Sequence, residues 1–570
     1  MPGKAKENLG FAEIWESILP RSASGRRVKA KTKPFLPGME EDLEAELDCL
    51  EAVTTLLNDH SDAFTELFGI LQSSKDPFYA IALLKDGRPL PPAEIFVVAH
   101  LCFTVSRLRQ VLESTGISRW PEKTIPLSLQ QLEKHLLPGS KGQPTFYVSD
   151  TYSVPLAKAR SKRREKERMW RQEMAREAGE VEKIIGRKPG LKEEIAIRKT
   201  NYDQIEKARL MPELGEAKET LTHVHFRLKA TTDAVRLERE INRLRQKERS
   251  LEEEVLLELS QKVRNHLSEI ERATEAIGEL DFLMCKAELA MSMGATRPEI
   301  IAMDTLQTAG FAKTAGVEPT SYMPLVLEGA SHPLVRKEVE SRGGSYQPVS
   351  IYIDSTVSVI TGPNMGGKTV ALSTVGLCVA MAQWGLMVPC SLMKFGFYDF
   401  IHFQSQEEEV PGLSSFATEI VSLKEPLSRM DERGLILLDE VGRGTNPSQG
   451  LALYTALLAY YLERDSAGST VVATTHYHGL ADMLGVPHWQ VRGLVPGAHD
   501  LGRLSHTWSN GADGIDWLYR HMDYTLQRVG PETPTPQDAL LVARVLGLNK
   551  KIVEKAQAFY DSKEVESGCT

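Results

Sequence analysis

The chain has few of the features that mark secreted, metal-binding or membrane proteins. Among its 570 residues are only six cysteines, and none forms a Cys-x-x-Cys pair or a metal-like Cys/His spacing. This pattern argues against a disulfide framework and the usual cysteine-based metal sites, so we expect buried or incidental free thiols. The first residues contain no apolar signal-peptide core. We therefore expect a cytoplasmic protein without a membrane partner.

An overall excess of positive charge is also missing. The formal net charge is −9 at pH 7, with 42% hydrophobic and 25% charged residues, which is ordinary for a soluble protein. Binding to nucleic acid would therefore need a local basic patch. The length predicts several domains, with at least one large hydrophobic core.

The chain does contain a complete phosphate-binding motif. Thr361-Gly-Pro-Asn-Met-Gly-Gly-Lys-Thr369 follows the apolar run 357–360 and precedes a segment of helical character. In this strand–loop–helix setting the glycines let backbone N–H groups converge on a phosphate, and the helix N-terminus adds positive charge. Lys368 can reach the β- and γ-phosphates, and the Thr369 hydroxyl can bind Mg²⁺. We predict ATP and Mg²⁺ as cofactors. The nucleotide-binding residues of this loop would be Gly362, Pro363, Asn364, Met365, Gly366, Gly367, Lys368 and Thr369.

Two further strand ends carry polar residues. Asp439 and Glu440 follow four aliphatic residues, which favours a buried strand end over an ordinary surface acidic pair. Asp439 fits a Mg²⁺ ligand, and Glu440 fits the group that orients and deprotonates the attacking water. His476 follows the β-branched run 470–475. A lone histidine is usually structural, but one at the carboxyl edge of the same sheet can sense the γ-phosphate.

Two loops between these motifs are candidates for phosphate contacts. One is the helix-start pattern Gly412-Leu-Ser-Ser-Phe416, and the other is Gly442-Arg-Gly-Thr-Asn446. Both have backbone N–H groups and hydroxyls that can donate to a phosphate. Their spacing alone does not assign them a role.

The pattern along the chain predicts four regions. Residues 1–150 form a helical core, and residues 151–323 contain long helices, including an amphipathic one over about 234–290 with at most one break. An unbroken helix of about 45 residues would reach roughly 65–70 Å, so we interpret it as a lever. Residues 324–530 form an α/β domain whose parallel sheet contains 350–353, 357–360, 434–438 and 469–474. Residues 531–570 form two short helices.

Basic residues crowd the segment from Val154 to Ile185. They are Lys158, Arg160, Lys162, Arg163, Arg164, Lys166, Arg168, Arg171 and Arg176, and fewer glutamates accompany them. Two interpretations remain open. The segment is either a solvated helix with internal ion pairs, or a face that contacts phosphates or a partner.

Four motifs together resemble the ATPase domain of MutS proteins. They are Thr361-Gly-Pro-Asn-Met-Gly-Gly-Lys-Thr369, Leu438-Asp-Glu-Val-Gly-Arg-Gly-Thr445, Gly450-Leu-Ala-Leu453 and Ala473-Thr-Thr-His-Tyr477. The resemblance implies an ABC-type P-loop ATPase that works as a homodimer or as a dimer with a related subunit. In such a dimer Ser414, Ser415 and the loop around Thr445 and Asn446 would complete the partner's ATP site. It also places Tyr346 where the family stacks an aromatic ring on adenine.

Other segments resemble the shorter, second bacterial type of MutS protein. Residues 11–57 and 90–112 resemble its helical core, 278–287 the end of its lever, and 539–558 its helix-turn-helix dimerisation segment. Set against the family pattern, we expect no mismatch-reading domain before the helical core to present its Phe-x-Glu wedge to DNA, and no nuclease domain after residue 565. Residues 186–234, where the family has a DNA-holding clamp, are short and lack its pattern. We therefore expect the DNA-reading parts to be reduced or absent.

Three functions follow as hypotheses. The first is a DNA-binding ATPase related to mismatch repair or recombination, in which paired domains close on ATP, move the lever helices and clamp double-stranded DNA. The alternative is a protein-remodelling ATPase, such as a reactivase of adenosylcobalamin-dependent aminomutases, because the DNA-reading elements are reduced. The third is a P-loop protein without turnover, which the complete set of Lys368, Asp439, Glu440 and His476 disfavours.

Overall fold

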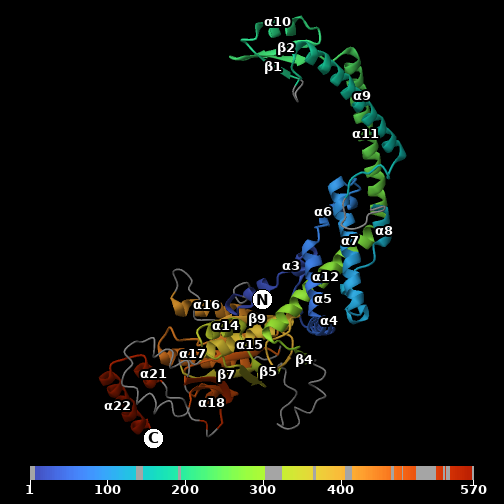
Figure 1. The fold of residues 1–570 in the computed structure, drawn as a ribbon. Helices are drawn as coiled ribbons and strands as arrows, with labels where there is room; N and C mark the ends of the chain where they lie inside the picture. Colours follow the sequence, from blue (N-terminus) through green and yellow to red (C-terminus); the bar gives the residue numbers. More distant parts are fainter. Residues whose placement is uncertain are drawn as a thin grey trace. The chain divides into compact units, whose positions relative to one another are not determined.

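The computed structural model describes most of the chain, with gaps between the ranges. The described residues are 7–136, 146–189, 194–301, 324–363, 367–404, 414–463, 468–477, 479–495, 521–530, 533 and 539–567, without the side chains of Ala217, Ser415 and 561–567. The chain forms two compact units. The first comprises Met1–Gln72, Val111–Ile125 and Ile277–Thr570, and the second comprises Ser73–Gln110 and Pro126–Ala276. Figure 1 shows the elements of both.

Helices dominate the N-terminal part, as expected for residues 1–150. They are α2 (Phe11–Ser17), α3 (Ala23–Lys31), α4 (Glu40–Asp59), α5 (Ser61–Ser73), α6 (Phe78–Lys85), α7 (Pro92–Ser114), the 3₁₀ turns η1 (Ile117–Arg119) and η2 (Glu122–Thr124), and α8 (Gln130–Leu136). Helix α4 shows why: Leu43, Leu47, Leu50 and Val53 recur at helical spacing and are buried. By length and composition α7 is apolar enough to cross a membrane. However, 56% of its most apolar 18-residue stretch is buried inside the fold, as in a core helix.

The main sheet of the first unit has six strands in the order β13-β12-β7-β11-β10-β9. They are β7 (Val357–Thr361), β9 (Phe400–Gln404), β10 (Gly434–Asp439), β11 (Thr470–Thr474), β12 (His488–Leu494) and β13 (Met522–Arg528). All neighbours are parallel except β12 and β13. The central strands are aliphatic and buried on both faces, as a helix-covered parallel sheet requires.

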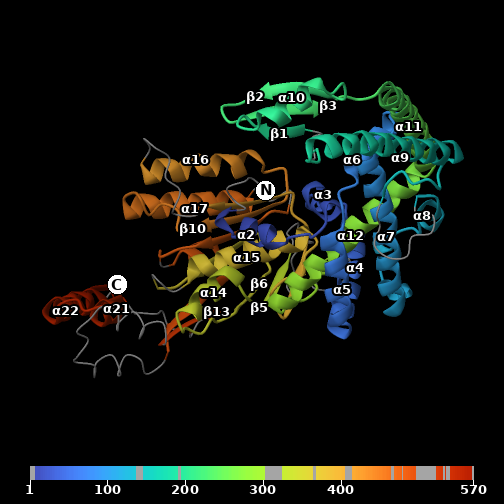
Figure 2. The ribbon, with the colours of Figure 1, turned by 45° about the horizontal axis from the view of Figure 1, so that its top comes forward.

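Helices cover both faces of this sheet. Helix α15 (Lys368–Gln383) packs into the hydrophobic core on one face, and α16 (Ser415–Ser428), α17 (Pro447–Glu463) and α18 (Leu480–Leu484) pack on the other. Figure 2 shows α15 and the pair α16 and α17 on opposite sides of β10.

A second sheet corrects one expectation. It contains β4 (Glu299–Ile300), β8 (Leu392–Phe395), β5 (Leu325–Ala330) and β6 (Val349–Ile353) in that order, and α14 (Pro333–Ser341) lies between β5 and β6 in the chain. The prediction that 350–353 belongs to the parallel sheet was wrong, because β6 pairs antiparallel with β5. Burial alternates along β6, which fits a sheet with one exposed face.

A buried ion pair joins α4 to helix α12 (Leu267–Met293) beside the carboxyl end of α15. The Lys286 ammonium, on a side chain only 1% exposed, lies 2.6 Å from Glu46 Oε1 and 3.0 Å from the Gly385 carbonyl oxygen. Glu46 also pairs with Lys123. Since helix carboxyl ends carry partial negative charge, the Lys286 cation stabilises α15 there.

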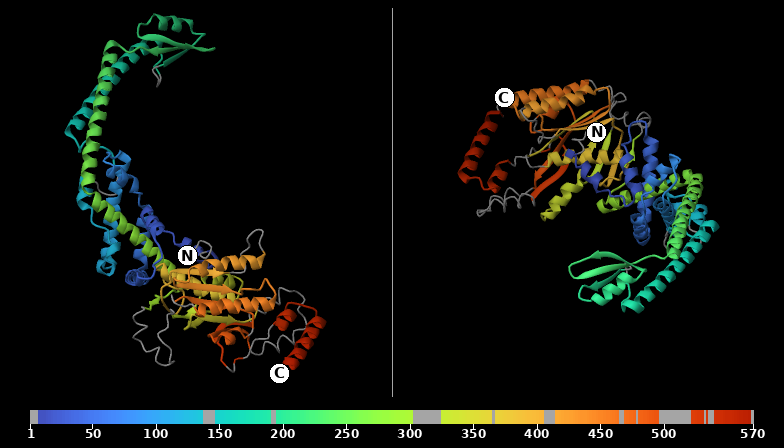
Figure 3. Two further views of the ribbon diagram at one scale, coloured as in Figure 1. Left: turned by 180° about the vertical axis from the view of Figure 1, so that it is seen from behind. Right: turned by 90° about the horizontal axis from the view of Figure 1, so that it is seen from above.

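Two long helices form most of the second unit. Helix α9 (Val154–Ile185) packs along α11 (Thr232–Asn265), as both views in Figure 3 show. The helix is interrupted at His266, and α12 begins at the next residue. The long amphipathic segment therefore has one break, which the sequence pattern allowed.

Ion pairs bind many of the basic residues of α9. Arg160 pairs with Glu248 and Glu252 of α11 at 3.0 and 2.6 Å, and Arg163 pairs with Glu248 at 2.7 Å. Lys166 reaches Glu240 at 2.7 Å. These contacts favour the ion-paired interpretation of the segment over a continuous phosphate-binding face.

A small folded module connects α9 to α11. It consists of β1 (Glu194–Arg198), α10 (Tyr202–Leu210), β2 (Leu214–Glu219) and β3 (His223–Leu228), with the strands in the antiparallel order β1-β3-β2. Alternate residues such as Ile195, Ile197 and Phe226 are buried in a hydrophobic core that the module shares with the adjoining ends of α9 and α11. The sequence analysis recognised no pattern here, yet the described part of this segment is a folded unit.

Two helices end the described chain, α21 (Ala539–Val545) and α22 (Lys550–Ser567), in agreement with the predicted pair. Their role in dimerisation stays a prediction. The five described cysteines are free, and all except Cys49 are buried. Burial raises the pKa of the Cys102 thiol to about 12, so that thiol is unreactive.

Candidate nucleotide-binding site

Three neighbouring strands bring the predicted residues to one edge of the main sheet. Strand β11 lies between β7 and β10, and all three are parallel. The phosphate-binding loop follows β7, Asp439 ends β10, and His476 follows β11. Because carboxyl ends of parallel strands share an edge, these groups surround one place, where α/β proteins bind ligands.

The described part of the loop places its backbone close to other elements. Gly367, the N-cap of α15, has φ +79°, which only glycine adopts without strain. A Cβ atom there would lie 3.0 Å from Tyr524 Cδ1 of β13. The predicted residues Asn364, Met365 and Gly366 lie outside the described residues.

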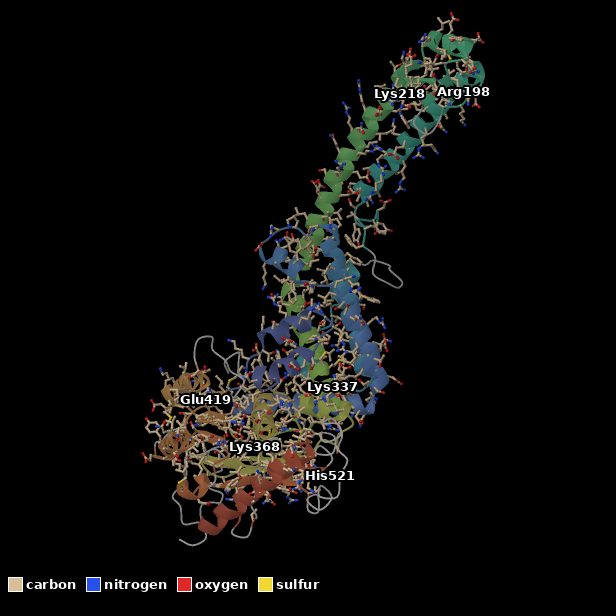
Figure 4. The ribbon with its side chains drawn as sticks, turned by 90° about the vertical axis from the view of Figure 1, so that its left-hand side faces the viewer. Arg198, Lys218, Lys337, Lys368, Glu419 and His521 are labelled. Atoms are coloured by element: carbon tan, nitrogen blue, oxygen red, sulfur yellow. The ribbon has the colours of Figure 1, made fainter. Side chains whose placement is uncertain are left out.

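Lys368 is 4% exposed and points back over its own loop. Its Nζ donates to the Gly362 carbonyl oxygen at 2.9 Å and to that of Pro363 at 3.3 Å, and it lies 2.9 Å from Glu440 Oε1. Figure 4 labels Lys368 within this domain. The ammonium group thus lies where loop and acidic pair meet.

The two predicted metal ligands, Thr369 and Asp439, are in contact with each other. The Thr369 hydroxyl donates to Asp439 Oδ2 at 2.8 Å, and the Thr474 hydroxyl donates to Asp439 Oδ1 at 2.6 Å. Burial raises the pKa of Asp439 above its ordinary value, although these two hydrogen bonds oppose the shift. Thr474, which pairs with Asp439 in register, is a site residue that the sequence analysis missed.

Glu440 adopts an unusual backbone conformation. Its φ is +49°, the one positive value among non-glycine residues of the described chain. The backbone N–H donates to the Thr474 carbonyl and hydroxyl oxygens, and Arg443 lies 3.2 Å from Glu440 Oε2. Since left-handed backbone costs a non-glycine residue on the order of 1–3 kcal/mol, the surroundings hold this carboxylate in place.

The remaining predicted residues make contacts of their own around this centre. His476 is exposed, with its ring centroid 4.2 Å from that of Tyr477. The Tyr346 hydroxyl accepts a 3.0 Å hydrogen bond from the His332 backbone N–H. Ser414 is exposed and caps α16, accepting from the Ala417 N–H, while the Ser415 side chain is not described.

The second candidate loop also forms a helix start. Asn446 precedes α17 and its Oδ1 accepts from the N–H groups of Ser448 and Gln449. Among the described contacts, neither Ser414 nor Asn446 hydrogen-bonds to the Lys368–Glu440 pair. Both are exposed, so a second molecule can reach them.

The fold around this site is a mixed α/β domain on a mostly helical chain. Residues 358–492, from β7 to β12, match the family model of MutS domain V. The match includes the described Lys368, Asp439, Glu440 and His476. The chain therefore contains a MutS domain V.

Curated proteins related to the chain are MutS2 and MutS proteins. It is 32% identical over 343 residues to Endonuclease MutS2 of Caldanaerobacter subterraneus subsp. tengcongensis, covering 58% of this chain and 36% of that protein. Endonuclease MutS2 of Geobacillus thermodenitrificans is 36% identical over 343 residues, with 58% and 37% covered. DNA mismatch repair protein MutS of Ruminiclostridium cellulolyticum is 29% identical over 281 residues, with 48% and 30% covered. The chain thus spans little more than a third of the MutS2 relatives' length.

Proposed function

We propose that this chain is a MutS-type ATPase of the ABC class that hydrolyses ATP with Mg²⁺ and uses the reaction to move its long helices on double-stranded DNA. The observation that carries the proposal is the meeting of Lys368, Thr369, Asp439 and Glu440 at one sheet edge. Relatives named as MutS2 endonucleases and as a mismatch repair protein support the connection to DNA.

The residues of the site fit both cofactors. At the N-terminus of α15 the N-cap residue Gly367 makes no side-chain cap hydrogen bond, and the helix dipole there favours an anion. The Thr369 hydroxyl and the Asp439 carboxylate are oxygen donors 2.8 Å apart, the ligand type that Mg²⁺ prefers. Bound Mg²⁺ would neutralise charge on the β- and γ-phosphates.

The contacts of Lys368 suggest how the chain's own groups change partners. Its ammonium group would exchange Glu440 for phosphate oxygens while keeping the Gly362 carbonyl. The released Glu440 carboxylate can then accept a proton from the attacking water. Arg443, 3.2 Å from the other carboxylate oxygen, limits how far Glu440 moves.

Turnover tests the proposal directly. Lys368→Ala should abolish ATP binding, because the buried ammonium has no substitute. Glu440→Gln should bind ATP but hydrolyse it roughly 10²–10⁴-fold more slowly, as loss of a general base predicts. Wild-type turnover in Glu440→Gln would assign the base to another residue. No hydrolysis by the wild-type protein at saturating ATP and Mg²⁺ would refute the whole proposal.

Dimer closure is the second part of the proposal. The exposed helix starts at Ser414 and Asn446 have a hydroxyl and an amide group that can donate to a phosphate. We infer that they face the γ-phosphate in a second copy or a related subunit. Light scattering of Glu440→Gln should show a dimer with ATP and a smaller species with ADP, and a monomer under both conditions would exclude closure.

DNA binding is supported by the open face of the module at residues 194–228. In register, Arg198 lies opposite His223, and Lys218 opposite His225, on the face away from the buried isoleucines. Arg198 and Lys218 are exposed, and Figure 4 labels both. Glu194 on the same face is ion-paired with Arg227, so Arg198 and Lys218 are the basic groups there that we expect to contact phosphates.

Salt dependence can separate this patch from other surfaces. Replacing Arg198 and Lys218 by alanine should weaken duplex binding and lower the slope of log K against log salt by roughly 0.9 per lost contact. Lys207→Ala on α10, an exposed lysine paired with Asp203, is the matched control and should change little. Absence of duplex binding at low salt, with or without ATP, would favour the protein-remodelling alternative.

A further inference from the structure

The loop after Glu440 is held by side chains from two other elements. Gly442, two residues beyond the acidic pair, has φ +87°. Its N–H donates to Glu419 Oε2 of α16 at 2.9 Å, and its carbonyl oxygen accepts from the Tyr477 hydroxyl at 3.2 Å. Both backbone polar groups of Gly442, in the loop after Glu440, are therefore fixed by side chains from outside that loop.

Backbone packing holds the same residue from a third side. A Cβ atom on Gly442 would lie 3.0 Å from Gly450 Cα, in the first turns of α17. A Cβ atom on Gly450 would lie 2.5 Å from the Gly442 carbonyl oxygen and 2.4 Å from the Tyr477 hydroxyl. The loop therefore packs directly against the backbone of α17, in a space that a side chain on either glycine would fill.

Glu419 connects this loop to a different part of the site. It lies in the first turns of α16, the helix that Ser414 caps. Its carboxylate is half-buried and reaches Gly442 rather than the Lys368 cluster. Figure 4 labels Glu419 and Lys368 in the same domain. Of the hydrogen bonds described, the one to Gly442 is the direct link between α16 and the loop that bears Glu440.

We propose that Glu419 is a positioning residue for ATP hydrolysis, which holds the Glu440 loop to α16 and so ties the water-activating carboxylate to the helix facing the partner. The inference rests on the proposed ATPase function. A hydrogen bond from a backbone N–H to a carboxylate is short and directional, so a shift of α16 on dimer closure moves Gly442 with it. Tyr477, next to the predicted sensor His476, holds Gly442 from the other side.

Steady-state hydrolysis in the full chain tests this role. Glu419→Ala should lower kcat roughly ten- to hundredfold, the effect of losing a charge-assisted hydrogen bond. The affinity for fluorescent ADP should stay within about twofold, because Glu419 contacts neither the phosphate loop nor Asp439. Glu419→Gln keeps an acceptor oxygen and should recover kcat to within about fivefold of wild type. Glu425→Ala, an exposed glutamate on the same helix, is the control and should match wild type.

The outcomes separate this inference from the proposed function. Wild-type turnover together with an unchanged kcat in Glu419→Ala overturns the inference alone, whereas inactive wild-type protein overturns the ATPase itself. An equal loss of ADP affinity and kcat, or no recovery with Gln, would show a merely structural role. If Glu419→Ala does not fold, Glu419→Gln and Tyr477→Phe decide. Tyr477→Phe removes the other support of Gly442 and should lower kcat roughly two- to tenfold at unchanged ADP affinity, and an unchanged kcat would overturn the inference.

Discussion

The ion pair between Lys286 and Glu46 gives a sharp prediction, because its two members are unequally buried. The Lys286 side chain is 1% exposed and that of Glu46 is 15% exposed. Glu46 has a second cation, Lys123, whereas the other partners described for Lys286, the Gly385 carbonyl oxygen and the Phe282 ring 4.9 Å away, carry no formal charge. Burial raises the pKa of Glu46, but Lys286 and Lys123 outweigh this and keep it below its ordinary value.

Replacing Glu46 should therefore lower the free energy of unfolding more than replacing Lys286 does. Glu46→Ala leaves a buried ammonium without a counter-charge and should destabilise the first unit by about 3–5 kcal/mol. Lys286→Met keeps most of the apolar volume and leaves Glu46 paired with Lys123, so it should cost less than about 2 kcal/mol. Glu44→Ala on the same helix is the control, since its exposed pair with Arg297 should contribute at most about 1 kcal/mol.

Amide hydrogen exchange of the peptide that ends at Gly385 measures the effect where it arises. Glu46→Ala should speed exchange in the last turn of α15 far more than Glu44→Ala does, because the capping cation loses its own anchor. Equal exchange in Glu46→Ala and Glu44→Ala would refute the reasoning. So would a greater loss of stability in Lys286→Met than in Glu46→Ala.

Two further predictions concern other parts of the first unit. Burial lowers the pKa of His332 from 6.5 to about 4, so between these pH values the unfolded chain binds a proton at His332 and the folded chain does not. The free energy of unfolding should therefore fall as the pH drops from 6.5 to about 4. His332→Gln should reduce this pH dependence when stability is measured by urea titration. Gly278→Ala should lower the free energy of unfolding by roughly 1–2 kcal/mol, because the new Cβ atom would lie 2.9 Å from the Ser24 carbonyl oxygen. Gly69→Ala is the control and should stabilise its helix, because a Cβ atom there meets nothing within 4 Å. Equal thermal midpoints of the two variants would contradict this prediction.

The sequence predicts that Lys368, Thr369, Asp439 and Glu440 meet at one sheet edge, because the motifs that contain them are local. Each motif is recognised from a few consecutive residues. One is a glycine loop between a strand and a helix, and the other is an acidic pair after four aliphatic residues. Thr474 was missed although it precedes His476 by two residues, because a threonine in a β-branched run is indistinguishable from a strand former. Only the register with Asp439 reveals its hydroxyl as a ligand-orienting group.

Contacts between distant segments could not be predicted in the same way. Lys286 and Glu46 are 240 positions apart, and Glu419 and Gly442 are 23 apart on different elements. The run at 350–353 was assigned to the wrong sheet, since a short aliphatic run does not say which neighbour it pairs with. The module at 194–228 did carry a signal, because Val224, Phe226 and Leu228 alternate with polar residues as a half-buried strand does.

Helix α15 has an anchor at each end and almost no exposed surface between them. Its first residue, Lys368, contacts Glu440, and the residue after its C-cap, Gly385, accepts from Lys286. A helix of 16 residues is about 24 Å long, and one buried on nearly every side is stiff. We therefore expect a displacement of its first turn to move the whole helix as one rigid body and to reach Lys286 of α12 without a hinge in between.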